Sequence, residues 1–147
     1  MAAGAFILYN SGKEAIIDST FNLETAGDTI VAVLVLTGYT PAATHTTWAD
    51  LVAQVVLDGD YGPITVTGQA VTETAGTVTF DAADVAFGDP VTITAKYIAL
   101  VKRVGGTLAT TDPLIGYMDL DTGGGSVAST NAQFQVNWNA SGIFTST

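Results

Sequence analysis

Cysteine is absent from the sequence, and basic residues are scarce. Without cysteine the chain can form neither a disulfide bond nor a thiolate metal site. Lys and Arg total 4 against 14 Asp and Glu, which gives a formal net charge of -10. Because binding to phosphates requires a basic patch, this balance argues against a nucleic-acid partner, and it disfavours a membrane surface for the same reason.

Long hydrophobic runs are also missing. The longest one covers residues 30–36, whereas a transmembrane helix needs about 20 apolar residues. The first residues carry no basic segment, and the apolar stretch at residues 6–9 is too short for the core of a signal peptide. We therefore expect neither a membrane span nor a secretion signal.

The sequence does contain ample apolar material for a hydrophobic core. Hydrophobic residues make up 48% of the 147 residues and charged residues 12%, which is the opposite of the composition of disordered chains. This length suits one domain. We expect a single β domain over residues 1–147, with residues 1–5 as a candidate flexible N-terminal arm.

The clearest pattern lies near the end of the chain, at residues 133–144. Phe134, Val136 and Trp138 alternate with amide side chains, and this period of two is typical of a strand with one apolar face. A chain end this apolar is expected to be tucked into a sheet. The three side chains should share one core with Val33, Phe80 and Ile93.

Most of the remaining chain has the pattern of short strands separated by turn residues. Residues 29–36 are β-branched or apolar on both faces, which predicts a centrally buried strand. Residues 91–101 predict one long strand with Ile93, Ala95 and Tyr97 on the same face. Further strands are expected at residues 6–9, 64–67, 69–73, 77–80, 85–87 and 114–120.

Helical signals are few. Residues 47–55 are the best helix candidate, because Thr47 can cap a helix whose apolar residues share one face. Residues 13–21 fit either a strand or a short helix. The whole pattern predicts an all-β fold, a single-domain β-sandwich or jelly-roll-like barrel with one or two short helices.

Residues that could carry chemistry have simpler interpretations as loop and turn residues. His45, the only histidine, lies in a polar loop without a nucleophile motif nearby. Asp58 with Asp60, and Asp119 with Asp121, have the spacing of calcium-binding carboxylates, but the EF-hand pattern is lacking. Aspartates also start turns by accepting hydrogen bonds from the backbone, and we favour that interpretation.

A second acidic pair, Asp81 and Asp84, could be imagined as the two carboxyl groups of a glycosidase. A turn between two strands explains the same spacing more simply. We therefore predict no catalytic residue, no cofactor-binding residue and no metal ligand, and we expect the protein not to be an enzyme.

Four segments, at residues 8–13, 28–41, 79–87 and 113–120 continuing to 136–144, resemble a family of small structural proteins from tailed bacteriophages. The likeness includes Gly38-Tyr-Thr-Pro41 after a strand and Asn137-Trp-Asn-Ala-Ser-Gly-Ile-Phe144 near the end of the chain. It spans nearly the whole sequence. The resemblance implies an all-β accessory protein of the virion, assembled in the host bacterial cytoplasm, and it implies no catalytic residues.

Two functions follow from this resemblance as expectations. The first is a capsid decoration or cement protein that stabilises the phage head by binding assembled shell subunits. The alternative is a tail, neck or fibre component that binds a host receptor or glycan, for which exposed Tyr and Trp side chains would form a stacking surface. An enzyme such as a glycan hydrolase ranks last.

The expected partners are the major capsid protein or other virion subunits, together with further copies of the chain in a homo-oligomer. Neither nucleic acid nor a membrane is expected as a partner. Two adaptable pieces, the N-terminal arm and a glycine-rich loop, should make the contacts. The predicted interface residues are Met1, Ala2, Ala3, Phe6, Asp121, Gly123, Gly124, Gly125 and Ser126.

Overall fold

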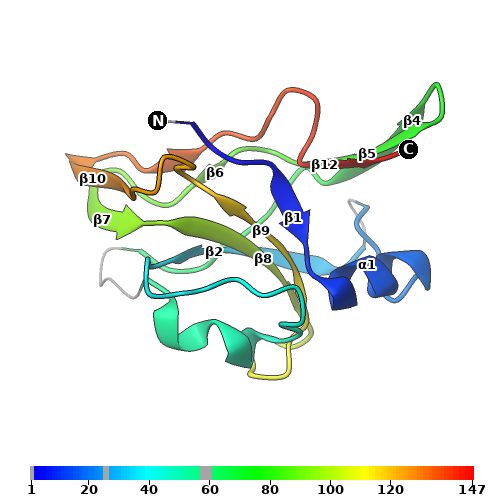
Figure 1. Ribbon diagram of the computed structural model, residues 1–147, viewed down its shortest axis with the longest axis horizontal. Helices are drawn as coiled ribbons and strands as arrows, with labels where there is room; N and C mark the ends of the chain where they lie inside the picture. The colour runs from blue at the N-terminus through cyan, green and yellow to red at the C-terminus, as the bar shows by residue number, and fades with distance from the viewer. Residues whose placement is uncertain (1, 25–26, 57–60) are drawn as a thin grey trace.

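A five-stranded antiparallel sheet lies at the centre of the computed structural model, which describes residues 2–24, 27–56 and 61–147. Figure 1 shows this sheet crossing the middle of the molecule. Its strands, in spatial order, are β1 (Phe6–Leu8), β9 (Leu114–Asp119), β8 (Tyr97–Arg103), β2 (Thr29–Val35) and β3 (Ile64–Thr65).

Three smaller antiparallel sheets lie on one side of the central sheet (Figure 1). Together with the central sheet they enclose the larger apolar core, so the fold is an all-β, sandwich-like arrangement, as predicted. No closed barrel forms among the residues that the structure describes. The smaller sheets pair β6 (Val85–Ala86) with β11 (Gln135–Val136), β7 (Val91–Ala95) with β10 (Val127–Ala132), and β5 (Thr77–Asp81) with both β4 (Ala70–Thr74) and β12 (Phe144–Ser146).

Strand β2 is buried on both faces, as its sequence predicted. Ile30 and Leu34 belong to the core under the small sheets, whereas Val31 and Val33 belong to a second cluster on the opposite face of the central sheet. The second cluster is covered by the loop that follows β2. The expectation that Val33 shares a core with Trp138 is therefore wrong, because Val33 has the opposite parity along β2 from the residues that face Trp138.

The other members of the predicted core are confirmed. Phe134, Val136 and Trp138 are buried in the same cluster as Phe80 and Ile93. The alternation of buried and exposed residues continues through residues 133–139, although only Gln135 and Val136 make ladder pairs. The chain end is also held in a sheet, since β12 pairs with β5.

The predicted long strand at residues 91–101 is two strands in different sheets. Lys96 separates β7 from β8, and its backbone N–H donates to Val35 while its carbonyl accepts from Leu120. This extra residue changes the parity, so Ala95 and Ile98 face the larger core but Tyr97 packs against the second cluster. Because β8 is buried on both faces, this break leaves no clear trace in hydrophobic periodicity.

The predicted helix at residues 47–55 is replaced by two 3-10 turns, Trp48–Asp50 and Val52–Gln54. The predicted start at Thr47 is confirmed, because Thr47 is the N-cap of the first turn. The Asp50 carboxylate accepts hydrogen bonds from the backbone N–H groups of Thr46 and Thr47 there. The segment does not continue as an α-helix because its end pairs with the end of β2. Val56 donates to Leu34, and Leu36 donates to Gln54.

The undecided segment after β1 is a short helix, α1 (Asn10–Ile17). It begins three residues earlier than the range considered from sequence. Gly12 is buried where the helix crosses β9, and a Cβ at this position would lie 2.2 Å from the carbonyl oxygen of Ile115. Within the described residues, no helix is long and apolar enough to cross a membrane.

Candidate functional site

The structure brings the two predicted contact pieces, the N-terminal arm and the glycine-rich loop, side by side. The backbone N–H and the hydroxyl of Thr122 both donate to the carbonyl oxygen of Ala2, at 2.9 and 3.0 Å. Gly4 donates to the carbonyl of Asp119 at 2.8 Å. The arm therefore continues the line of β1 along the turn after β9, and the two pieces form one surface.

This turn is held from inside by Lys96, a residue to which the sequence analysis gave no role. Its ammonium group lies 2.8 Å from the Asp119 carboxylate and 2.5 Å from the carbonyl oxygen of Asp121. The Lys96 side chain is only 9% exposed, so the pair lies largely out of water. A buried ammonium group without such partners would be strongly destabilising, and the pairing fixes where the turn leaves the sheet.

Asp119 and Asp121 have structural partners of their own. Asp119 Oδ1 accepts from the backbone N–H of Asp121, and Asp121 Oδ1 accepts from Gly123. Gly123, Gly124 and Gly125 are exposed, and Ser126 is partly buried. Met1 lies outside the described residues, whereas Ala2 and Ala3 are exposed.

Phe6 differs from the other predicted interface residues because its ring packs against other aromatic side chains of the same chain. Its ring is half-buried, stacks on Phe144 with centroids 5.8 Å apart, and meets Trp138 edge-on at 6.5 Å. The surface available to a partner at this edge is therefore the neighbouring Ile7, which is 49% exposed.

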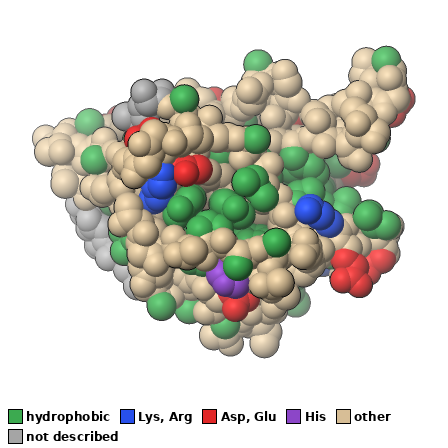
Figure 2. Space-filling view, in the orientation of Figure 1, with side chains coloured by type: hydrophobic (Ala, Val, Ile, Leu, Met, Phe, Trp, Pro, Cys, Tyr) green, Lys and Arg blue, Asp and Glu red, His purple; other side chains and the backbone are tan. Residues whose placement is uncertain are grey.

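A hollow of about 360 Å³ lies beside this edge. Its apolar lining comes from Ile7 of β1, Pro41 of the loop after β2, Tyr97 of β8 and Tyr117 of β9. Asp119 and Thr122 supply polar groups at the end nearest the arm. Figure 2 shows hydrophobic side chains gathered near the centre of this view of the molecule.

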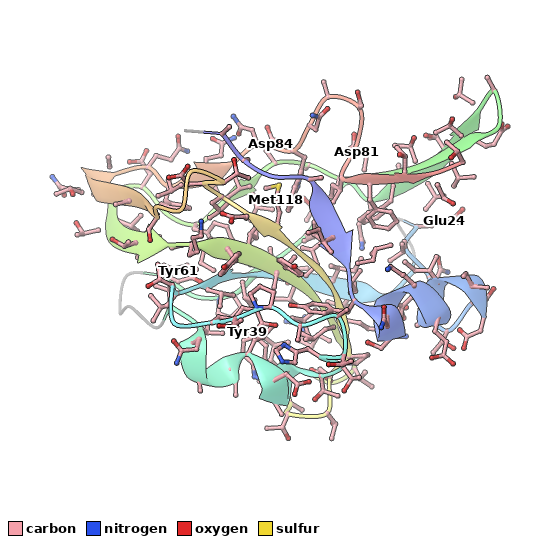
Figure 3. All side chains as sticks on the ribbon, in the orientation of Figure 1. Glu24, Tyr39, Tyr61, Asp81, Asp84 and Met118 are labelled. Carbon is pink, nitrogen blue, oxygen red and sulfur yellow. The ribbon has the colours of Figure 1, made fainter. Side chains whose placement is uncertain are left out.

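A hydrogen-bonded chain of Tyr9, Tyr39 and His45 lies in the second core cluster and its edge. The two phenol oxygens are 2.7 Å apart, and the Tyr39 oxygen is 2.7 Å from His45 Nδ1. Burial raises the pKa of both phenols, so both keep their protons at neutral pH. The chain joins the end of β1 to the loop after β2 and satisfies hydroxyls that would otherwise be buried without partners. Figure 3 labels Tyr39 in this loop.

His45 therefore lies in a loop, as predicted, but its hydrogen bond to Tyr39, and that of Tyr39 to Tyr9, were not predicted from the sequence. The separations of 30 and 6 residues give no local signal. Asp81 and Asp84 flank the link between β5 and β6 (Figure 3). Asp84 accepts from the backbone of Trp138, and Asp81 accepts from Ala82.

The metal interpretation gains no support from the part of the chain that is described, where no group of three or more His, Cys, Asp or Glu could hold an ion. The pair Asp58 and Asp60 lies outside the described residues.

A second hollow, of about 390 Å³, separates the segment after α1 from the sheet of β4, β5 and β12. We call it the hairpin groove. One wall carries Ile16, Phe21 and Leu23, and the other carries Val71, Val78, Phe80 and Phe144. Figure 1 shows the β4–β5 hairpin projecting away from the body of the molecule, and Figure 3 shows Glu24 in the region between the hairpin sheet and α1.

Comparisons of the chain with protein-family models, curated proteins and solved structures give no match in any of the three.

Proposed function

We propose that this chain is a non-enzymatic structural protein of a tailed-bacteriophage virion, where it decorates the capsid and stabilises the head. The class of protein rests on the sequence resemblance of the four segments described above. The structural support is a contact surface suited to another protein subunit, made of the β1 edge, the N-terminal arm and the turn at residues 119–126.

The observation that carries the proposal is the exposed apolar edge at β1. β1 is an outer strand of the central sheet, and Ile7 is about half exposed beside the hollow that Tyr97 and Tyr117 line. An exposed edge with apolar and aromatic side chains is a common site for pairing with another chain. The partners would be the major capsid protein or other virion subunits, with self-association bringing further copies to the shell.

The way this surface stabilises a head is physical rather than chemical. A ligand that binds only the assembled state lowers the free energy of that state by mass action. Buried contact with two neighbouring shell subunits would supply the binding free energy. No proton transfer, nucleophile or metal is needed for such a function.

The experiment is to add the purified protein back to heads from which it has been stripped. Heads carrying the wild-type protein should resist heat and low osmolarity better than stripped heads. Ile7→Lys should reduce occupancy on the head, because it places a charge in the apolar contact. Val104→Lys is the matched control, since Val104 is 71% exposed in a separate loop.

The lining of this hollow also favours one second function, a tail, neck or fibre component that binds a host glycan. Tyr97 and Tyr117 are only partly buried, and Asp119 and Thr122 lie at the same hollow. Aromatic faces next to polar groups suit sugars. If stripped particles keep their stability but lose adsorption to host cells, this second function replaces capsid decoration.

A further inference from the structure

The hairpin groove is an apolar surface that the residues described by the structure leave open to solvent. Val71 and Val78, on its hairpin wall, are large apolar side chains that are 38% and 42% exposed. In the β4–β5 register Val71 lies opposite Phe80, and Val78 lies opposite Glu73. These residues share one face of the hairpin, and the other face carries Thr72 and Thr79.

The shape of the groove suits an extended chain segment. The hairpin wall spans three antiparallel strands, and β4 is the outer strand of that sheet. All five residues of β4 are exposed. An extended segment lying along this sheet would turn every second side chain toward the groove, because strand side chains alternate between faces.

Acidic residues around the groove indicate the charge of the segment that it would bind. Glu24 lines it directly, Asp18 immediately precedes the lining residue Ser19, and Glu73 shares the apolar face of the hairpin. The Lys102 ammonium group lies over the Phe21 ring, 5.2 Å from the ring centroid. Its charge is already matched by Asp28 at 2.9 Å. The potential at the rim is therefore negative.

We propose that the hairpin groove binds an extended segment of another protein that carries alternating apolar side chains and Lys or Arg at its ends. The apolar side chains fill the space between the two walls, and the basic ends pair with the carboxylates at the rim. This inference does not depend on the proposed function, because the groove and the β1 edge are separate surfaces.

A second copy of the same chain fits this groove poorly. Each copy has a formal net charge of -10 and only 4 basic residues, and like charges brought together oppose association. Lys102, which contacts the groove residue Phe21, is already paired with Asp28. Charge complementarity therefore favours a basic partner over self-association.

The test uses the full chain and a pair of fluorescent synthetic peptides. Both peptides alternate Val and Thr, but one has Lys at both ends and the other has Glu. Fluorescence anisotropy at low and at physiological salt measures binding, and amide chemical shifts locate it. We expect only the Lys-flanked peptide to bind, and its affinity should be lower at physiological salt than at low salt. The shifts should occur in residues 16–24, 71–80 and 144–146.

Three variants make the test specific. Val78→Lys should weaken binding of the Lys-flanked peptide at least about tenfold, because it places a like charge in the apolar wall. Glu24→Lys should weaken it about two- to fivefold, the range for one exposed ion pair, and should improve binding of the Glu-flanked peptide. Val104→Lys, the matched control, should change neither affinity. Circular dichroism melting of each variant confirms that it is folded.

Four results would overturn the proposal. They are no binding of the Lys-flanked peptide at millimolar concentration, equal binding of both peptides, unchanged affinity in folded Val78→Lys, or chemical shifts confined to the surface at Ile7 and Tyr117. The assay contains no virus particle, so failure of capsid decoration leaves its outcome unaffected.

Discussion

Replacing Trp138 with Ala should destabilise the fold strongly. The indole is 9% exposed and lies in the larger core. Its Nε1 donates to the carbonyl oxygen of Ala83 at 3.0 Å, and its ring meets Phe6 edge-on. The substitution therefore removes packing, one hydrogen bond and an aromatic contact from the place where the C-terminal segment joins the body.

The size of the effect follows from these contacts. Truncation of a buried Trp to Ala costs about 3–5 kcal/mol in the free energy of unfolding. Trp138 also borders a hollow of about 400 Å³, so solvent can enter part of the space that the indole leaves. We therefore expect the lower part of the range, about 3–4 kcal/mol. For a chain of this length that corresponds to a fall of about 10–15 °C in Tm.

Two further variants separate the contribution of packing from that of the hydrogen bond. Their stabilities are measured by thermal and urea unfolding followed by circular dichroism. Trp138→Phe keeps most of the packing but leaves the Ala83 carbonyl without its donor, and should cost about 1–2 kcal/mol. Asn137→Ala, at the exposed neighbouring position, should stay within about 0.5 kcal/mol of wild type. A Trp138→Ala protein with the wild-type Tm would refute the placement of this side chain in the core.

Three other substitutions test separate features of the fold. Gly12→Ala should destabilise by about 1–3 kcal/mol in urea, despite the better helix propensity of Ala, because its Cβ would press on the Ile115 carbonyl oxygen; a more stable variant would contradict this close approach. Asp50→Ala should cost about 1 kcal/mol at pH 7. Backbone N–H groups hold the pKa of Asp50 below 3.8, so its contribution to the free energy of unfolding is present above that pH and disappears as the pH falls through the lowered value. The stabilities of the wild-type and Asp50→Ala proteins should therefore converge in acid. A stability difference that stays constant with pH would show that the carboxylate charge is not involved. Lys96→Met should cost about 2–3 kcal/mol because it leaves the Asp119 carboxylate without its cation, and an unchanged urea midpoint would contradict the importance of this ion pair.

Local patterns in the sequence were sufficient to predict most strands. β2 and the residues around β11 were predictable because burial on both faces, or on alternate residues, leaves a direct trace in hydrophobicity. The β4–β5 hairpin was predictable because Ala75 and Gly76 interrupt two alternating runs. In each case the signal and the structure involve the same few neighbouring residues.

The errors occurred where a distant contact decides the local structure. The break at Lys96 depends on Val35, Asp119 and Asp121, which are far away in the sequence. The 3-10 turns after Thr47 depend on pairing between residues 54–56 and the end of β2. Neither competing contact can be recognised from the segment alone, so propensity and periodicity favoured the regular element in both places.

The candidate surfaces were predictable only in part. The N-terminal arm and the loop at residues 121–126 were predictable as separate contact pieces, and the structure joins them through Ala2 and Thr122. The hairpin groove was missed. Its only sequence signal is the pair Val71 and Val78, whose alternation with Thr indicates an apolar hairpin face but gives no sign that the face stays uncovered.

Phe144 links the two surfaces and determines which substitutions can test them separately. Its ring lines the hairpin groove, lies 5.2 Å from Phe80, and stacks on Phe6 at the start of β1. Removing either Phe6 or Phe144 would disturb the core and both surfaces at once, because residues in contact have non-additive effects. Ile7 and Val78 have exposed side chains that line different hollows, the one beside β1 and the hairpin groove. Loss of binding in those variants, with the Tm preserved, therefore reports on one surface at a time.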